Sequence, residues 1–197
     1  MSPAQILERS YRTLKQRLIE GAFDPGQRLE AARLADDMHV SITPIRDVLN
    51  RLTGEGLVDA IAGGGFYMPM PDEGGLRDLL DWNSLLSLHA AGSPRRAMPE
   101  VTSASSDDAD RAACLFLQLA ESRGNREMIR AVEHLNDRLY AARLLDARIL
   151  SETGAEIQDL EESLRAGNAD LSKRIKTYHR RRKARVSTYI RLLCKRS

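Results

Sequence analysis

The sequence predicts a mainly α-helical protein, in which three short helices and a β-hairpin precede an all-helical bundle. Two observations support this fold class. Apolar residues change from helical spacing to short strand-like runs near residue 57, and helical spacing returns after a Pro- and Gly-rich segment at 69–75. Such a segment is typical of a domain boundary. We therefore expect two domains, residues 1–70 and 75–197.

The first two helices are expected at residues 4–20 and 30–38. The turn signal Asp24-Pro25-Gly26 separates them. Apolar side chains of the first helix recur at i, i+4, i+7 and i+11, which places them on one face. They are Leu7, Tyr11, Leu14 and Leu18.

A third helix is expected to begin at Thr43-Pro44. Threonine suits the N-cap, and proline suits the first helical position, where a missing N–H costs nothing. Gly54 or Gly56 would end the helix. Its buried stripe would consist of Ile45, Val48, Leu49 and Leu52.

Two strand-like runs follow, at 57–61 and 66–70, with a Gly-rich loop at 62–65 between them. This pattern predicts a β-hairpin. Three helices followed by a hairpin is the order of a winged helix-turn-helix domain.

The remainder of the chain is expected to be helical. Helices are predicted near 75–91, 105–123, 125–149, 152–166 and 168–194, with a loop at 92–106. Apolar stripes at 112–120 and 186–193 predict burial between helices, without indicating which partner covers them.

Composition narrows the class of protein. Apolar residues make up 42% of the 197 residues, which is enough for a folded core. The two cysteines are far apart and favour a reducing compartment over a disulfide framework. Neither a secretory signal nor an apolar run of about 20 residues is present, so we expect a cytoplasmic protein with no membrane partner.

Charge is distributed unevenly along the chain. Residues 171–197 contain eleven Lys or Arg and no Asp or Glu, whereas residues 71–170 contain eleven basic and nineteen acidic residues. The basic segment either pairs with the acidic middle of the chain or contacts a polyanion. Residues 1–70, with eight basic and nine acidic residues, are close to neutral.

The segment from Tyr11 to Phe66 resembles the DNA-binding domain of GntR transcription regulators. The matching stretches are LIEGAFDPGQRL at 18–29, LADDMHVSITPIRDVLNRLTGEGLV at 34–58 and the glycines at 63–65. Residues 135–146 and 164–179 are similar to the helical FCD effector domain of the FadR branch. The resemblance implies a homodimer that binds a pseudo-palindromic operator and responds to a small-molecule carboxylate effector.

The predicted third helix offers side chains that suit base recognition. Arg46 and Asn50 lie four residues apart and share a face, and they can bond guanine and adenine respectively. Ser41 and Thr43 suit a phosphate, or they only cap the helix. Arg51 either joins this surface or pairs with Asp47. The full set of expected DNA-binding residues is Arg28, Arg33, Ser41, Thr43, Arg46, Asn50, Arg51 and Gly64.

The chain departs from the family at several of these places. Relatives usually carry a basic residue at the position of Ile42, and they often carry basic wing residues at Ala60, Ile61 and Gly64. With few cations, attraction to phosphates is weak. We therefore expect the chain to bind DNA more weakly, or over a narrower range of sequences, than these relatives do. Complete loss of DNA binding is an alternative.

The resemblance also implies sites in the helical domain. The family's metal-ligand positions correspond to Glu133, Asp137 and His179, with Ile157 at a fourth position that cannot coordinate. Two carboxylates and an imidazole could hold a divalent metal ion. An effector pocket would involve a second set of residues. These are Asn83, Arg130 and Arg138.

No catalytic constellation emerges from the sequence, so we do not expect an enzyme. The leading hypothesis is a dimeric, sequence-specific transcription regulator. One alternative is an interaction protein that kept the fold but lost effector sensing or operator binding. Another is a nonspecific nucleic-acid binder that uses the basic C-terminal helix, in particular residues 180–183.

Overall fold

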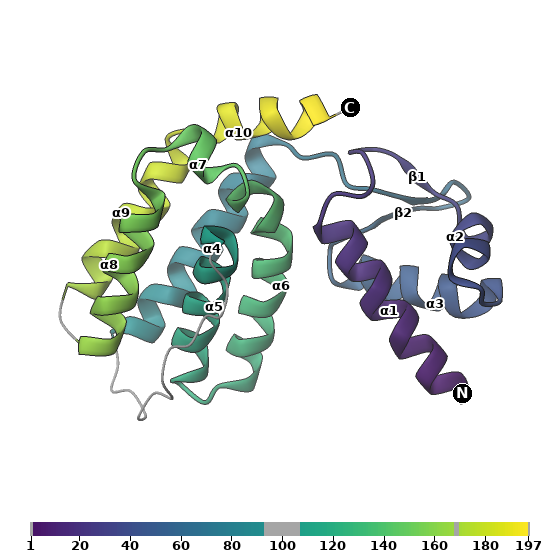
Figure 1. Cartoon of the computed structure of the whole chain (residues 1–197), viewed down its shortest axis with the longest axis horizontal. Helices are drawn as coiled ribbons and strands as arrows, with labels where there is room; N and C mark the ends of the chain where they lie inside the picture. The colour runs from purple at the N-terminus through teal and green to yellow at the C-terminus, as the bar shows by residue number, and fades with distance from the viewer. Residues whose placement is uncertain (1, 93–106, 168–169, 197) are drawn as a thin grey trace. The chain divides into compact units, whose positions relative to one another are not determined.

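The computed structural model describes residues 2–92, 107–167 and 170–196, which form two compact units (Figure 1). The N-terminal unit runs to Pro71 and includes the segment from Cys194, and the C-terminal unit is Asp72–Leu193. The predicted fold class is confirmed: three helices and a small sheet precede an all-helical part. None of the described helices is both long and apolar enough to cross a membrane.

The N-terminal unit contains three helices and a three-stranded sheet. Strand β3 lies between β1 and β2 and is antiparallel to both. The hairpin was predicted, but β1 was not, because two residues are too few to show alternation. The elements are α1 (Pro3–Ile19), β1 (Arg28–Leu29), α2 (Ala31–Met38), α3 (Ile42–Gly54), β2 (Asp59–Ile61) and β3 (Gly65–Tyr67).

Helix α3 begins earlier than the sequence predicted. Ser41, not Thr43, is the N-cap, and Pro44 is the third helical residue. Proline is tolerated there because the first four N–H groups of a helix have no intrahelical partner. The predicted stripe of α3 is buried in the core of the unit. That core also includes Tyr11, Leu14 and Leu18 of α1.

Helices are the only regular secondary structure among the described residues of the C-terminal unit. Two predicted helices are each divided: the first breaks after Arg143, and the second breaks after Lys183. Residues 93–106 of the predicted loop lie outside the described residues. The helices are α4 (Glu73–Ala91), α5 (Asp108–Glu121), α6 (Arg126–Arg143), α7 (Asp146–Ile149), α8 (Thr153–Ala166), α9 (Leu171–Lys183) and α10 (Val186–Leu193).

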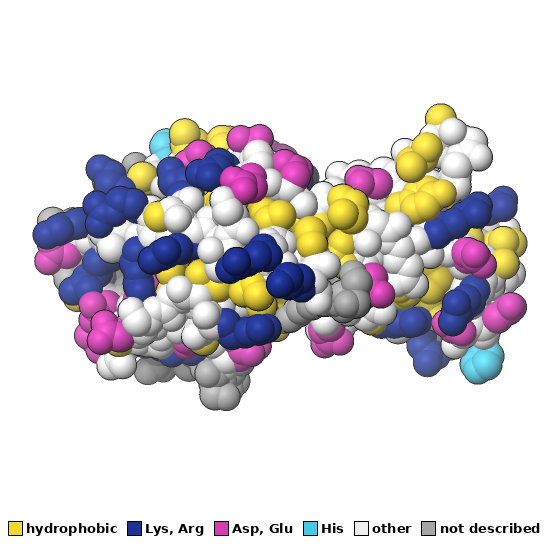
Figure 2. All heavy atoms as spheres, turned by 90° about the horizontal axis from the view of Figure 1, so that it is seen from above, with side chains coloured by type: hydrophobic (Ala, Val, Ile, Leu, Met, Phe, Trp, Pro, Cys, Tyr) yellow, Lys and Arg dark blue, Asp and Glu magenta, His cyan; other side chains and the backbone are white. Residues whose placement is uncertain are grey.

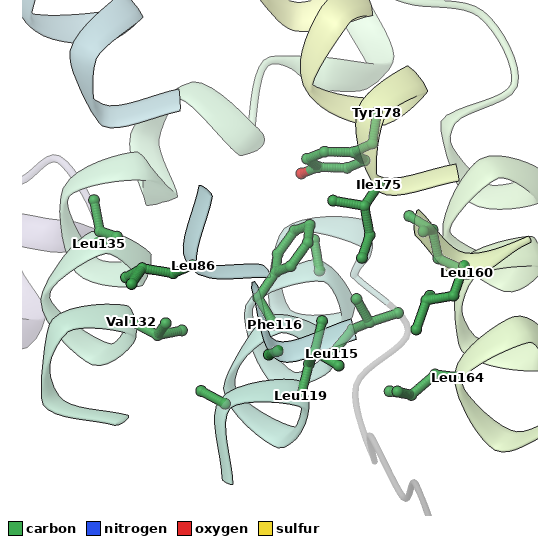
Figure 3. Packing of buried hydrophobic residues seen from close by; sticks show 14 of the residues in the cluster. Leu86, Leu115, Phe116, Leu119, Val132, Leu135, Leu160, Leu164, Ile175 and Tyr178 are labelled. Carbon is green, nitrogen blue, oxygen red and sulfur yellow. The ribbon is translucent and has the colours of Figure 1, made fainter. Parts of the chain in front are cut away.

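Helix α5 contributes a central part of the core of this unit. Figure 3 shows Phe116 of α5 among apolar side chains from several helices, including Val132 of α6. The rings of Phe116 and Tyr178 meet edge to face, with 5.1 Å between their centroids. The apolar stripe at 112–120 is therefore covered within the unit. Val186 and Tyr189, from the stripe at 186–193, are also buried, in a second cluster with Leu76 and Leu80.

Candidate nucleic-acid interface and buried polar cluster

One face of helix α3 carries polar side chains that have no partner among the described residues. Its buried stripe packs against the unit's core, and each residue of that stripe is at most 1% exposed. An adjoining face carries Ile42, Arg46 and Asn50 at i, i+4 and i+8, and all three are exposed. Within the described chain, neither Arg46 nor Asn50 has a side-chain hydrogen bond or ion pair. Both side chains are therefore available to a ligand.

The N-terminus of α3 has no side-chain cap. Ser41 occupies the N-cap position, but its hydroxyl makes no capping hydrogen bond. By contrast, Ser2 caps α1 and Asp72 caps α4. Thr43 is exposed in the first turn of α3. The two hydroxyls and the free N–H groups at the positive end of the helix dipole suit an anion such as phosphate.

The wing contains no cation of its own, because residues 57–70 include neither Lys nor Arg. Strand β1 supplies one. Arg28 pairs in register with Tyr67, and its guanidinium nitrogens lie 3.7 Å from the position that a Cβ of Gly65 would take. Gly64 forms part of the tight turn, where its N–H donates to the carbonyl of Ile61 at 2.8 Å. The structure thus brings Arg28 and Gly64 to the same hairpin.

The other two predicted arginines differ from each other. Arg33 is exposed on α2. Arg51 packs over the ring of Tyr11, with 3.4 Å between its guanidinium carbon and the ring centroid. It also donates to Glu55 at 3.3 Å and to Glu8 at 3.4 Å. Arg51 therefore joins α3 to α1, and the alternative pair with Asp47 does not form.

Glu55 lies at the centre of this contact between α1 and α3. It accepts hydrogen bonds from Tyr11 at 2.8 Å and from Lys15 at 3.1 Å. Burial alone would raise the pKa of Glu55, but the hydrogen bonds from Tyr11, Lys15 and Arg51 lower it overall. The ionised carboxylate therefore holds α1 against the end of α3.

The predicted effector residues do not come together. Arg130 is exposed and pairs with Glu127 at 2.9 Å, and Arg138 is also exposed. Asn83 is fully buried and lines a cavity of about 10 Å³. Arg143, which is not among the predicted effector residues, lines the same cavity and is 5% exposed. Its helical spacing from Asn136 and Leu139 could have identified it, because all three lie on the buried face of α6.

Several buried polar atoms around this cavity lack partners. Arg143 Nη1 donates to Asn136 at 2.9 Å. Among the residues that the structure describes, Arg143 Nη2 and the Tyr178 hydroxyl have no hydrogen-bond partner. Leaving such groups unsatisfied in an apolar interior is costly. The cavity is therefore lined by groups that could form hydrogen bonds with a bound ligand.

A buried ion cluster borders the cavity. Arg182 Nε donates to the Asp146 carboxylate at 2.8 Å, and Arg182 Nη1 donates to Glu156 at 2.8 Å. The Tyr189 hydroxyl also donates to Asp146. Burial by itself lowers the pKa of Arg182, but the phenol of Tyr178 and the two carboxylates raise it overall. The cluster joins α7, α8, α9 and α10.

The predicted metal ligands do not assemble. Glu133 is exposed on α6, whereas His179 is 1% exposed in the core. Both ring nitrogens of His179 are engaged, by the Ile175 carbonyl at 2.8 Å and by the Asn83 amide at 2.9 Å. Over the described ranges, no three His, Cys, Asp or Glu side chains form a group that could hold a metal ion. The geometry therefore gives the predicted site at Glu133, Asp137 and His179 no support.

The basic C-terminal segment pairs extensively with the acidic middle of the chain. Within residues 180–183, Arg182 is buried, Arg181 pairs with Glu156 at 2.9 Å, and Lys183 pairs with Asp81. Arg180 is exposed. Figure 2 shows basic and acidic side chains interspersed on the displayed face of the C-terminal unit. These pairs favour the structural interpretation of the charge run.

Helix α4 carries exposed apolar side chains. Trp82 is 48% exposed and Leu85 is 55% exposed. They are three residues apart and therefore neighbours on one helical face. Large exposed apolar groups that lie together are typical of interaction surfaces.

Comparison with known proteins assigns the class of the N-terminal unit. Residues 7–68 match the family model for bacterial regulatory proteins of the gntR family. The unit is thus a winged helix-turn-helix of the gntR type. The chain is also 38% identical over 68 residues to the Nta operon transcriptional regulator of Aminobacter aminovorans. That match covers 34% of this chain and 32% of the relative.

Two solved structures resemble the whole chain. One, from Rhodococcus sp. RHA1, is described as a transcriptional regulator GntR. It is 18% identical in sequence, with a TM-score of 0.76, and the match covers 92% of this chain and 97% of that chain. The other is McbR/YncC of E. coli, with 19% identity and a TM-score of 0.67, over 95% and 99% of the two chains. At such identities the likeness establishes the fold.

Proposed function

We propose that the chain is a sequence-specific, DNA-binding transcription regulator and that α3 enters the major groove. The observation that carries the proposal is the free face of α3 with Arg46 and Asn50, within a domain of the gntR type. Arginine bonds guanine O6 and N7, and asparagine bonds adenine N6 and N7. The partner is DNA, which accords with a cytoplasmic location.

Contacts to phosphates would position this helix. The uncapped N-terminus of α3, with Ser41 and Thr43, suits one phosphate. Arg28 beside the wing and Arg33 on α2 add cations. Gly64 allows a close approach of the wing backbone. Arg51 is omitted from this set because Glu55 and Glu8 hold it.

The test is selection from a library of labelled DNA duplexes at two salt concentrations. We expect wild type to select a palindromic site, and Arg46→Ala to weaken that binding by about 1–3 kcal/mol. Arg9→Ala is the matched control, because it removes an equal charge from an exposed position on α1. Failure to select any site would refute the proposal and favour an interaction protein. Weak, salt-sensitive binding unchanged by Arg46→Ala would favour the basic C-terminal helix instead.

A homodimer would present two α3 helices to a pseudo-palindromic site. We infer that the α4 face with Trp82 and Leu85 joins the two copies, because the apolar stripes at 112–120 and 186–193 are largely buried within the unit. Analytical ultracentrifugation should give a dimer for wild type and a monomer for Trp82→Glu. A dimer that survives both Trp82→Glu and Leu85→Glu would exclude this face.

The cavity at Arg143 favours a second function, the binding of a small carboxylate effector. Arg143 is a buried cation whose Nη2 has no hydrogen-bond partner within the described part of the chain, and a carboxylate is the complementary group. A volume of about 10 Å³ admits little more than one water-sized group, so an organic acid would have to separate the surrounding helices. Binding would thereby be coupled to a change in the unit.

Thermal unfolding with a panel of small carboxylates tests this second function. A ligand should raise the unfolding temperature of wild type and of Arg130→Met, but not that of Arg143→Met. An equal rise in all three proteins would place the ligand elsewhere, and no rise with any carboxylate would oppose an effector of this class.

A further inference from the structure

Ile42 occupies an unusual position for a large apolar side chain. It is the first residue of α3 and is 38% exposed, although most isoleucine, leucine and valine side chains of the N-terminal unit lie in its core. It stands at the start of the row that continues with Arg46 and Asn50. Contact with an apolar partner removes the isoleucine side chain from water and is therefore favourable in free energy. The composition of this row therefore indicates what α3 would meet.

The major groove displays one apolar group, the C5-methyl of thymine. Side chains that contact this methyl read thymine without a hydrogen bond. We propose that Ile42 is a specificity-determining residue that recognises a thymine methyl in the DNA site. This inference rests on the proposed function and extends it, because it assigns a base to a residue with no hydrogen-bonding side chain.

The spacing along α3 locates the thymine relative to the other contacts. Residues four apart on a helix are separated by about 6 Å along its axis. Base pairs are separated by about 3.4 Å. If Arg46 bonds a guanine, the thymine at Ile42 lies at most about two base pairs from it along the DNA axis, on the side away from the base that Asn50 contacts. The expected half-site therefore has a thymine, a guanine and an adenine within a few base pairs.

The wing offers a matched control. Ile61 is also an isoleucine and is 56% exposed, but it lies in β2 of the hairpin. The thymine methyl projects into the major groove and is absent from the minor groove. A wing that approaches the minor groove cannot read this methyl. Ile61→Ala should therefore leave recognition of the methyl intact.

The experiment begins from the site selected by the wild-type protein. Each thymine of that site is replaced in turn by deoxyuridine, which removes only the methyl. Dissociation constants are then measured for wild type, Ile42→Ala and Ile61→Ala. We expect one thymine in each half-site at which deoxyuridine weakens wild-type binding about fourfold, the effect of roughly one buried methyl group. Ile42→Ala should show no such loss at that position, and Ile61→Ala should show the full loss.

Two results would overturn the inference. One is a wild-type protein that binds every deoxyuridine duplex as tightly as the thymine duplex. The other is an Ile42→Ala protein that retains the wild-type loss at the sensitive position. Failure to select any site would refute the proposed function, and this inference with it, so the two failures are distinguishable. Because Ile42 is exposed and alanine favours helices, circular dichroism should show Ile42→Ala folded as wild type.

Discussion

Acid should destabilise the C-terminal unit through a single buried histidine. His179 is 1% exposed, and its pKa falls to about 3 because burial disfavours the charged ring, while Arg182 and Arg143 repel it. In the unfolded chain a histidine has a pKa of about 6.5. Below that value the unfolded state binds the proton and the folded state does not. Stability is therefore complete above about pH 6.5 and is lost as the pH falls towards about 3.

The size of this effect follows from linkage. Each pH unit below the unfolded pKa costs up to about 1.4 kcal/mol, so the loss at pH 5 should be about 2 kcal/mol. The assay is urea unfolding between about pH 7.5 and pH 5, where few other groups titrate. The only tryptophan of the chain, Trp82, lies in α4 and reports on the C-terminal unit.

Two variants separate this histidine from the others. His179→Gln should unfold more easily at neutral pH but lose little further stability at pH 5. His134→Gln, which changes an exposed histidine of α6, should keep the wild-type pH dependence. The reasoning would be refuted if His179→Gln lost as much stability between the two pH values as wild type does.

Three further predictions concern the ion pairs. Arg182→Met leaves the buried Asp146 carboxylate without its cation and should lower the free energy of unfolding by about 3–5 kcal/mol. Lys183→Met breaks an exposed pair and should lower it by less than about 1 kcal/mol. Urea unfolding measures both losses, and equal losses would contradict the difference in burial between the two pairs. Adding Asp146→Asn to Arg182→Met should restore part of the loss in the same assay. Glu55→Gln should destabilise the N-terminal unit at neutral pH. Because the pKa of Glu55 is lowered, the difference in stability between wild type and Glu55→Gln should shrink as the pH falls below about 4.5. Thermal melts followed by circular dichroism at several pH values measure this difference, and a difference that does not change with pH would contradict the prediction.

The sequence predicted the parts of the protein that depend on local periodicity. The buried stripe of α3 and its exposed row with Arg46 follow from helical spacing alone. Strand β1 could not be predicted from local spacing, because its two residues acquire their conformation from pairing with β3, which follows α3 in the sequence. Arg46 and Arg51 are both exposed arginines of α3, and what distinguishes Arg51 is its contact with Tyr11 and Glu8 of α1, which local spacing does not predict.

The C-terminal site was harder to predict for a related reason. Selecting Glu133 and Asp137 relied on resemblance, whereas the apolar pattern of α6 places Asn136 and Arg143 on the buried face. A shift of a few residues moves a side chain from solvent to the interior of a helix bundle. The carboxylate partners of Arg182 lie on two other helices, α7 and α8, so no spacing along the chain could have identified them.

The pairing of β1 with β3 has a consequence for the order in which the N-terminal unit folds. The backbone contacts Gly26 N–H to Met68 and Met68 N–H to Gln27 extend this ladder beyond the strands. They join the turn before α2 to the end of the hairpin and enclose both α2 and α3 in one loop of chain. Contacts distant in sequence form late because loop closure costs entropy. We therefore expect the three helices to collapse first and the wing to attach last, so amide protons of the wing should exchange with solvent through openings that leave the helices assembled.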